Sequence, residues 1–173
     1  MRGMERQMQL EAMAIAVPHV KEHPNRLPFE GVLTVVNAVS DKAPSGARGH
    51  RVILAREAVE DALPSLLGMA VDYRPGLDGH DARCKVGLVT EADLVGKKLV
   101  VKGYLYARDF PEVAQAIQSQ RPETLGMSYE LADARVEDMR AEVWKLTRVT
   151  FTGAAILLRE KAAYTETSFT MAS

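Results

Sequence analysis

Two neighbouring segments with alternating apolar and polar residues constrain the fold more than any other feature. In "KKLVVKGYLYA", one side carries Lys98, Val100, Lys102, Tyr104 and Tyr106, and the other, more apolar side carries Leu99, Val101, Gly103 and Leu105. Because successive side chains of a strand point to opposite faces, this period of two predicts a strand with one face on a core. The preceding segment "CKVGLVTEADL" predicts a second strand, with Gly96 between the two. Together they predict an antiparallel hairpin.

The rest of the chain adds strands and helices without a regular alternation. Further strands are expected over 27–39, at the start of 51–68, over 69–73, around 123–133 and over 140–158 with a break at Gly153. Helices are expected in the remainder of 51–68, where Pro64 shortens or bends the helix, and over 109–120 with Asp109 as N-cap. This order predicts an α+β fold, a small and mostly antiparallel β-barrel with two or three surrounding helices.

The length of 173 residues suggests a single domain. We expect that domain to span 27–160. Residues 1–26 are expected to form a mobile or lightly packed N-terminal segment, and residues 161–173 are expected to form a polar C-terminal tail that frays.

Composition excludes several classes of function. The 22 basic residues balance the 23 acidic ones, so no basic field attracts nucleic acid. No apolar run is long enough to span a membrane. The single cysteine, Cys84, allows no internal disulfide and fits a reducing compartment. Cys84 and the nearby His80 are too few ligands for a structural zinc site, and there is no glycine-rich phosphate loop. We therefore expect no cofactor and no metal.

Ser128 in "ETLGMSYELAD" (123–133) is the residue whose role depends most on its surroundings. A serine in a strand is usually structural, but it becomes a nucleophile when a base takes its proton. His80 lies on a loop at the edge of a strand, where scaffolds commonly carry functional groups. The other histidines lie beside prolines or at the end of a turn-rich loop: His19, His23 and His50.

The order of these features resembles one known family. A loop histidine (His80), a glycine that opens a strand (Gly87), a hairpin and a helix precede "LGMSYE", with its Gly-x-Ser and neighbouring tyrosine. This order and spacing resemble the prohead maturation proteases of tailed bacteriophages, which are related to the herpesvirus assemblins. The early "FEGVLTVVN" and the late "FTGAAIL" look like the opening and closing strands of that family, so the resemblance covers most of 27–160.

The resemblance implies a serine endopeptidase with Ser128 as nucleophile and His80 as general base. It implies that the substrates are the major capsid protein and scaffold segments, cleaved inside an assembling procapsid in the cytoplasm of a bacterial host. It also implies a possible homodimer, as in the herpesvirus relatives. No nucleic acid or membrane partner is expected.

The third catalytic residue departs from the family pattern. That family places it on the strand after the serine strand, where alignment by spacing puts Arg148, or Thr150 two residues on. Neither orients a protonated imidazole as a carboxylate does. Glu130, two residues from Ser128, shares its strand face and is the first alternative; the other candidates are Glu137, Asp138 and Glu142.

Two other functions remain open at this point. A capsid-assembly or scaffold-associated protein on the same fold, with weak or lost catalysis, is favoured by Arg148. A β-rich binding module in which His80 and Ser128 never meet is the third hypothesis. The oxyanion donors are unassigned, although Gly153 could expose backbone N–H groups at a strand break, as could a plain β-bulge.

Overall fold

The computed structural model describes residues 23–171, and the core of this region is a single curled sheet of eight strands. The sheet order is β2-β7-β3-β4-β5-β1-β8, with β6 paired to the other edge of β7. The strands are β1 (Leu27–Val35), β2 (Val52–Leu54), β3 (Ala70–Asp72), β4 (Lys85–Val95), β5 (Lys98–Leu105), β6 (Leu125–Val136), β7 (Trp144–Leu158) and β8 (Ser168–Met171).

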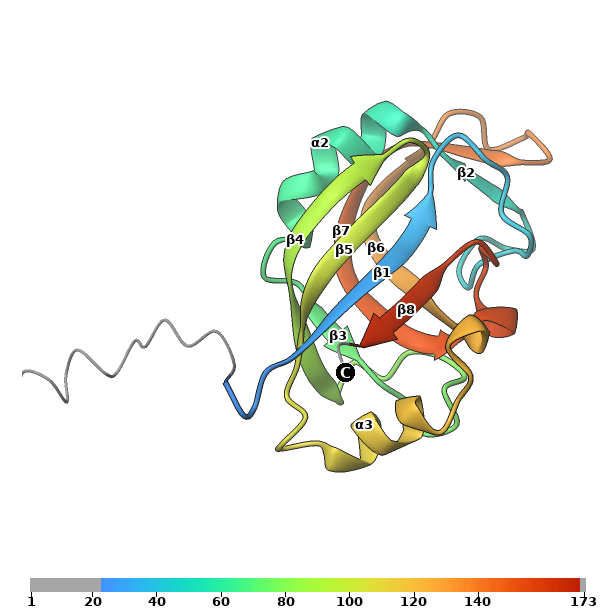
Figure 1. Cartoon of the computed structure of the whole chain (residues 1–173). Coiled ribbons are helices and arrows are strands. Elements are labelled where there is room, and N and C mark those ends of the chain that lie inside the picture. The colour runs from blue at the N-terminus through green and yellow to red at the C-terminus, as the bar shows by residue number, and fades with distance from the viewer. Residues whose placement is uncertain (1–22, 172–173) are drawn as a thin grey trace, which may run out of the picture.

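Within residues 23–171, two α-helices accompany the sheet, α2 (Arg56–Leu66) and α3 (Pro111–Gln118), and Figure 1 shows them at opposite ends of it. Most strand pairs are antiparallel; the exceptions are β2 and β3, which both run parallel to β7. The predicted α+β fold is therefore confirmed: the expected small, mostly antiparallel barrel with two or three helices is a curled, mostly antiparallel sheet with two helices in the described residues. Among the described residues, no helix is both long and apolar enough to cross a membrane.

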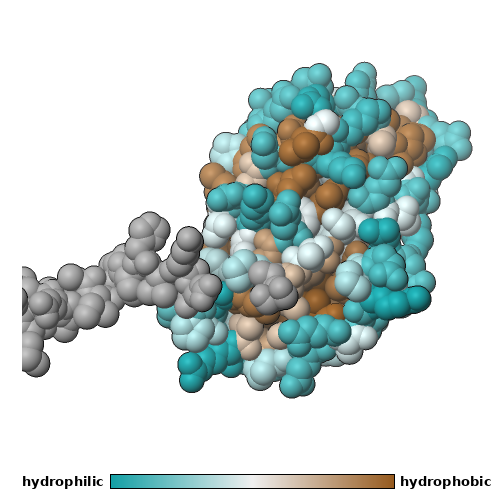
Figure 2. Space-filling model, viewed as in Figure 1, coloured by the Kyte–Doolittle hydropathy of each residue, from teal (hydrophilic) through white to brown (hydrophobic). Residues whose placement is uncertain are grey.

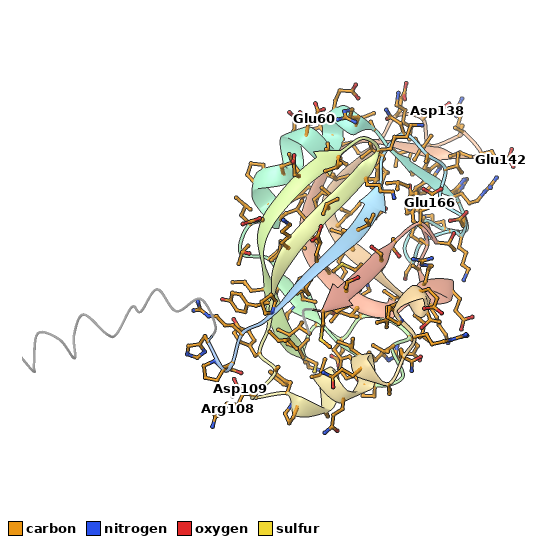
Figure 3. The ribbon with its side chains drawn as sticks, in the orientation of Figure 1. Glu60, Arg108, Asp109, Asp138, Glu142 and Glu166 are labelled. Atoms are coloured by element: carbon orange, nitrogen blue, oxygen red, sulfur yellow. The ribbon has the colours of Figure 1, made fainter. Side chains whose placement is uncertain are left out.

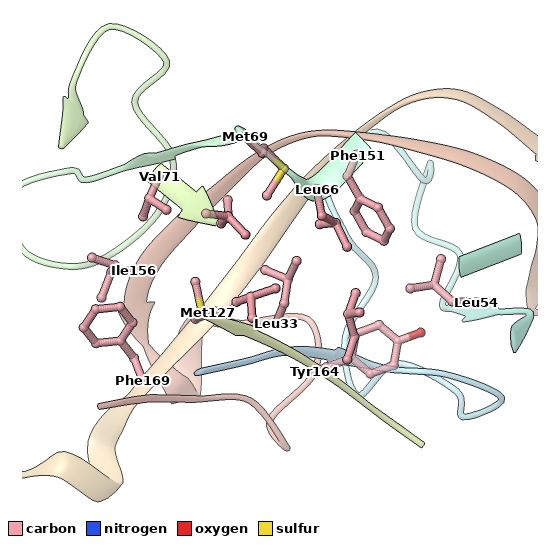
Figure 4. Close-up of a cluster of buried hydrophobic side chains, with 14 of the residues drawn as sticks. Leu33, Leu54, Leu66, Met69, Val71, Met127, Phe151, Ile156, Tyr164 and Phe169 are labelled. Atoms are coloured by element: carbon pink, nitrogen blue, oxygen red, sulfur yellow. The ribbon is translucent and has the colours of Figure 1, made fainter. Parts of the chain in front are cut away.

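The concave face of the sheet carries the main hydrophobic core. Figure 4 shows Met127 of β6 in its centre, near Leu33 of β1 and Phe169 of β8. Leu99, Val101 and Leu105 of β5 are buried, as their alternation predicts. Figure 2 shows one face of the molecule, on which hydrophobic areas are interspersed with hydrophilic ones.

Several local predictions need correction. The backbone N-cap of α3 is Phe110, without a side-chain cap, because the Asp109 carboxylate accepts a hydrogen bond from Asn25 instead. β7 runs unbroken through Gly153. Helix α2 contains Pro64 and ends two residues after it, in line with a proline that shortens the helix.

Residues 161–171, the described part of the expected tail, are ordered rather than frayed. Residues 168–171 form β8, which pairs with β1 and buries Phe169 against Phe29. The Tyr164 hydroxyl donates to the backbone oxygens of Ala38 and Val52. Thr167 accepts a hydrogen bond from the Met127 N–H, which ties this region to β6. The expected N-terminal segment 1–26 lies mostly outside the described residues.

Gly103 illustrates how tightly the strands pack. It lies on β5 between Val89 of β4 and Phe29 of β1. A Cβ at this position would collide with the Leu88 carbonyl and approach the Phe29 ring to 3.0 Å. Backbone cannot move aside as a flexible side chain can, so overpacking here strains the sheet.

We expect Gly103→Ala to lower the free energy of unfolding by about 2–3 kcal/mol, measured by urea denaturation. Gly96→Ala is the control, because a Cβ there meets no atom within 4 Å and only its positive φ of 62° resists substitution. That conformational penalty is about 1 kcal/mol. Equal losses in the two variants would contradict the packing argument.

Candidate functional site

Three adjacent strands align the residues that define the site. Ser128 of β6 pairs with Ala155 of β7, and Ala155 pairs on its other side with Asp72 of β3. Register partners in a sheet point to the same face. The neighbouring row, with Tyr129 on β6 and Val71 on β3, belongs to the main core. Ser128 and Asp72 therefore share the convex face, about 10 Å apart at their Cα atoms.

Glu130 lies on the same convex face, because it follows Ser128 by two residues in β6. Between them, Tyr129 points inward and packs edge-to-face on Phe151, with ring centroids 5.8 Å apart. Burial raises the pKa of the Tyr129 hydroxyl well above its usual value. The alternation along β6 thus separates a core residue from two polar residues on the outside.

Gly153 makes room for the Glu130 carboxylate. The two residues are register partners, and a Cβ on Gly153 would lie 3.2 Å from Glu130 Oε2. The register shifts after Glu130, so that Leu131 pairs with Phe151 and Thr152 forms a bulge. The expected strand break at Gly153 is therefore absent, and the irregularity is a β-bulge next to it.

The loop between β3 and β4 carries His80 onto this face. Its ends are joined where the Tyr73 N–H donates to the Cys84 carbonyl. Leu77 anchors its middle, since it is buried and its carbonyl accepts a hydrogen bond from the Leu158 N–H of β7 at 2.8 Å. An ion pair between Arg74 and Asp78 spans the outside of the loop. These contacts fix the loop over the end of β7.

His80 reaches two carboxylates through one ring nitrogen. Its Nδ1 lies 3.1 Å from Glu130 Oε1 and 3.5 Å from Asp72 Oδ1. The Asp72 side chain is only 1% exposed, whereas His80 and Glu130 are 21% and 39% exposed. The cluster is therefore buried on the Asp72 side and open to solvent on the Glu130 side.

Hydrogen bonding in the cluster is incomplete within residues 23–171. Neither Asp72 oxygen has a hydrogen-bond partner there, and His80 Nδ1 has none of good geometry. The 3.1 Å separation from Glu130 is short enough for a hydrogen bond, so it is the alignment that is poor.

The tautomer of His80 follows from these contacts. A neutral imidazole carries one N–H, and carboxylates at Nδ1 favour the proton there. The lone pair is then on Nε2, the nitrogen through which a histidine accepts a hydroxyl proton in acyl transfer. The arrangement can thus supply a base held in one tautomer next to the strand that carries Ser128.

The position derived for the third residue from spacing is wrong. Arg148 pairs with Arg135, seven residues along β7 from the partner of Ser128, or roughly 20 Å. Thr150 pairs with Ala132. Both line a groove against α2, away from His80. Arg148 therefore does not repel the His80 ring.

The remaining acidic candidates lie far from the cluster. Glu137, Asp138 and Glu142 belong to the end of the β6–β7 hairpin, after β6 ends and before β7 begins. Figure 3 shows Asp138 and Glu142 at the opposite end of the molecule from β3 and α3. Of the acidic candidates, only Glu130 contacts His80.

The other described histidines make contacts elsewhere, and the cysteine is unreactive. His50 stacks on Trp144 with ring centroids 4.3 Å apart, and His23 binds the Asn25 N–H. His19 lies outside the described residues. Burial raises the pKa of the Cys84 thiol, which disfavours the reactive thiolate.

Sequence reasoning missed Asp72. It ends a strand of three residues, too short to show a period, and its approach to His80 depends on the pairing of β3 with β7. The only available signal was an acidic residue at the end of an apolar segment, "MAVDY", just before the histidine loop.

Comparison with known proteins identifies the fold. The KSHV protease, solved in complex with a hexapeptide phosphonate inhibitor, matches with a TM-score of 0.55 and 14% identity over 86% of this chain and 65% of that chain. The bacteriophage T4 capsid assembly protease gp21 matches with a TM-score of 0.55 and 13% identity over 80% of this chain and 87% of that chain. No protein-family model and no curated protein sequence matches the chain.

These matches establish that the chain has the assemblin-like fold of the capsid assembly proteases, as the sequence resemblance predicts. Identities of 13–14% establish the fold alone. The chain spans slightly less than two thirds of the KSHV protease.

Proposed function

We propose that this protein is a serine endopeptidase that cleaves capsid or scaffold polypeptides during the assembly of a phage head. The observation that carries the proposal is the shared convex face of Ser128, Glu130 and Asp72, with His80 held against both carboxylates. The fold shared with the T4 capsid assembly protease supports the substrate class. Such cleavage would take place inside the procapsid, in the bacterial cytoplasm.

Each residue has a distinct role in the proposed reaction. Ser128 Oγ attacks the scissile carbonyl carbon while His80 Nε2 accepts its proton. The same nitrogen then gives the proton to the leaving amine, and water releases the acyl group in a second step. Ser128 is preferred to Cys84 as nucleophile because burial raises the pKa of that thiol.

The two carboxylates would support His80 in different ways. Glu130 is nearer to Nδ1 and would accept its proton in a hydrogen bond. Asp72 is almost fully buried, so its negative charge is weakly screened and would stabilise the imidazolium that forms during attack. Arg148, which favoured an inactive assembly protein, lies far along β7 and no longer supports that alternative.

We expect the wild-type chain to cleave a proteome-derived peptide library at sites with a common sequence preference, identified by mass spectrometry. Assembly proteases act where substrate is concentrated, so the assay is run with and without a salting-out ion such as citrate, which favours association. The Ser128→Ala variant serves as the blank. A wild-type pattern identical to that blank in both buffers would contradict the proposed activity.

A further inference from the structure

The cluster of Asp72, His80 and Glu130 has the spacing of a metal site. One ligand atom from each residue lies within 4.8 Å of the other two. In a tetrahedral zinc site with bonds of about 2.0–2.1 Å, neighbouring ligand atoms lie about 3.3 Å apart. The 3.1 Å and 3.5 Å separations from Nδ1 to the two carboxylates fall on either side of that value.

The charges of the cluster also favour a cation. Two carboxylates face one ring nitrogen, and a single Nδ1–H can donate to only one of them. Asp72 is 1% exposed and lacks a hydrogen-bond partner on either oxygen within residues 23–171. An unpaired carboxylate at such depth is costly unless a positive charge or a donor reaches it. A divalent ion between the three ligand atoms would satisfy Asp72 and neutralise both carboxylates.

We propose that Asp72 Oδ1, His80 Nδ1 and Glu130 Oε1 bind one Zn²⁺ ion. Two carboxylate oxygens and one imidazole nitrogen are a ligand set that zinc accepts, with the fourth position left to water. The imidazole disfavours Mg²⁺ and Ca²⁺, which bind through six or more oxygens. The exposed side of His80 and Glu130 gives the ion a route from solvent.

Zinc at this position would switch off the proposed base, an inference that rests on the proposed function. When the Nδ1 lone pair binds the metal, the single proton of the neutral imidazole resides on Nε2. Nε2 then cannot accept the Ser128 proton. Metal binding and general-base catalysis use the same ring in mutually exclusive states, so zinc would hold the enzyme inactive until it is removed.

Direct binding tests the site without any need for activity. The metal-free full-length chain is titrated with Zn²⁺ by calorimetry and with Co²⁺ by visible absorption, which reports the coordination geometry. We expect one ion per chain, an absorption band typical of four-coordinate cobalt, and weak or no binding of Mg²⁺. Absence of one-to-one Zn²⁺ binding would overturn the proposal.

Matched variants locate the ion. His80→Ala and Asp72→Asn are each expected to weaken Zn²⁺ binding by more than about 100-fold. This exceeds the loss expected when a residue that only hydrogen-bonds to a metal ligand is removed. Asp78→Asn changes a carboxylate on the same loop outside the cluster, and Ser128→Ala changes the proposed nucleophile; both should bind as the wild type does. Unchanged binding in Asp72→Asn and His80→Ala would place the ion elsewhere and overturn the site.

A labelling experiment separates this inference from the proposed function. Reaction of the wild type with a fluorophosphonate serine probe should stop in the presence of one equivalent of Zn²⁺ and resume after EDTA. Binding of zinc without an effect on labelling would overturn the switch. An absence of labelling in the metal-free protein would instead contradict the proposed function, while the calorimetric result would still decide the metal site.

Discussion

Replacing Ser128 with alanine should reduce kcat/KM on the best library peptide by about 10⁴- to 10⁶-fold, because the nucleophile and its covalent intermediate are lost. His80→Ala should cause a loss of similar size, and the double variant should be little worse than either alone. Such non-additivity is expected of residues that act as one unit. Steady-state kinetics on the purified variants provides the measurement.

Folding is not expected to account for this loss. Ser128 is half-buried on the convex face, and its neighbour Ala155 does not depend on the hydroxyl for packing. Ser119→Ala at the end of α3 is the matched control and should retain full activity. If Ser128→Ala retained more than a tenth of wild-type activity with the same melting temperature, Ser128 would not be the nucleophile.

Replacing Asp72 with asparagine should change activity and stability in opposite directions. Activity is expected to fall by about 10²- to 10³-fold, the usual effect of losing one group that stabilises transition-state charge. The free energy of unfolding should rise by about 1–2 kcal/mol, because a buried carboxylate without a hydrogen-bond partner is replaced by a neutral group of the same shape. Kinetics and urea denaturation of the same metal-free preparation measure both effects.

Two comparisons sharpen this prediction. Asp78→Asn, on the exposed part of the same loop, should leave both quantities within about 0.5 kcal/mol of the wild type. Glu130→Gln removes the proposed acceptor of the Nδ1 proton and should reduce activity by up to about 10⁴-fold, the effect of the corresponding substitution in trypsin. A destabilised Asp72→Asn variant would show that the carboxylate is paired in solution.

The sheet was predictable where the chain shows a local period. The alternation in β5 identified its buried face, and Gly96 with a φ of 62° forms the turn before it. β8 was missed because the segment "TETSFTMAS" is polar and buries only one large side chain, Phe169. Its stability comes from pairing with β1, a contact between opposite ends of the chain that no local pattern reveals.

The part of the site that follows from a local period was predictable, and the part that depends on long-range pairing was not. Glu130 follows from Ser128 by the period of a single strand. Arg148 was wrongly placed near Ser128 because spacing along the chain does not reveal the length and bulges of the β6–β7 hairpin. These set the register and place Ala155 opposite Ser128. Asp72 depends on the parallel pairing of β3 with β7, a tertiary contact across more than 80 residues.

The most direct test of the account is the intact mass of the metal-free protein after reaction with a fluorophosphonate probe. It should be measured with and without citrate, on the wild type, Ser128→Ala and His80→Ala. The account predicts one adduct on the wild type, mapped to Ser128, and none on either folded variant. No adduct on the folded wild type under either condition, or one that persists in Ser128→Ala, would contradict it.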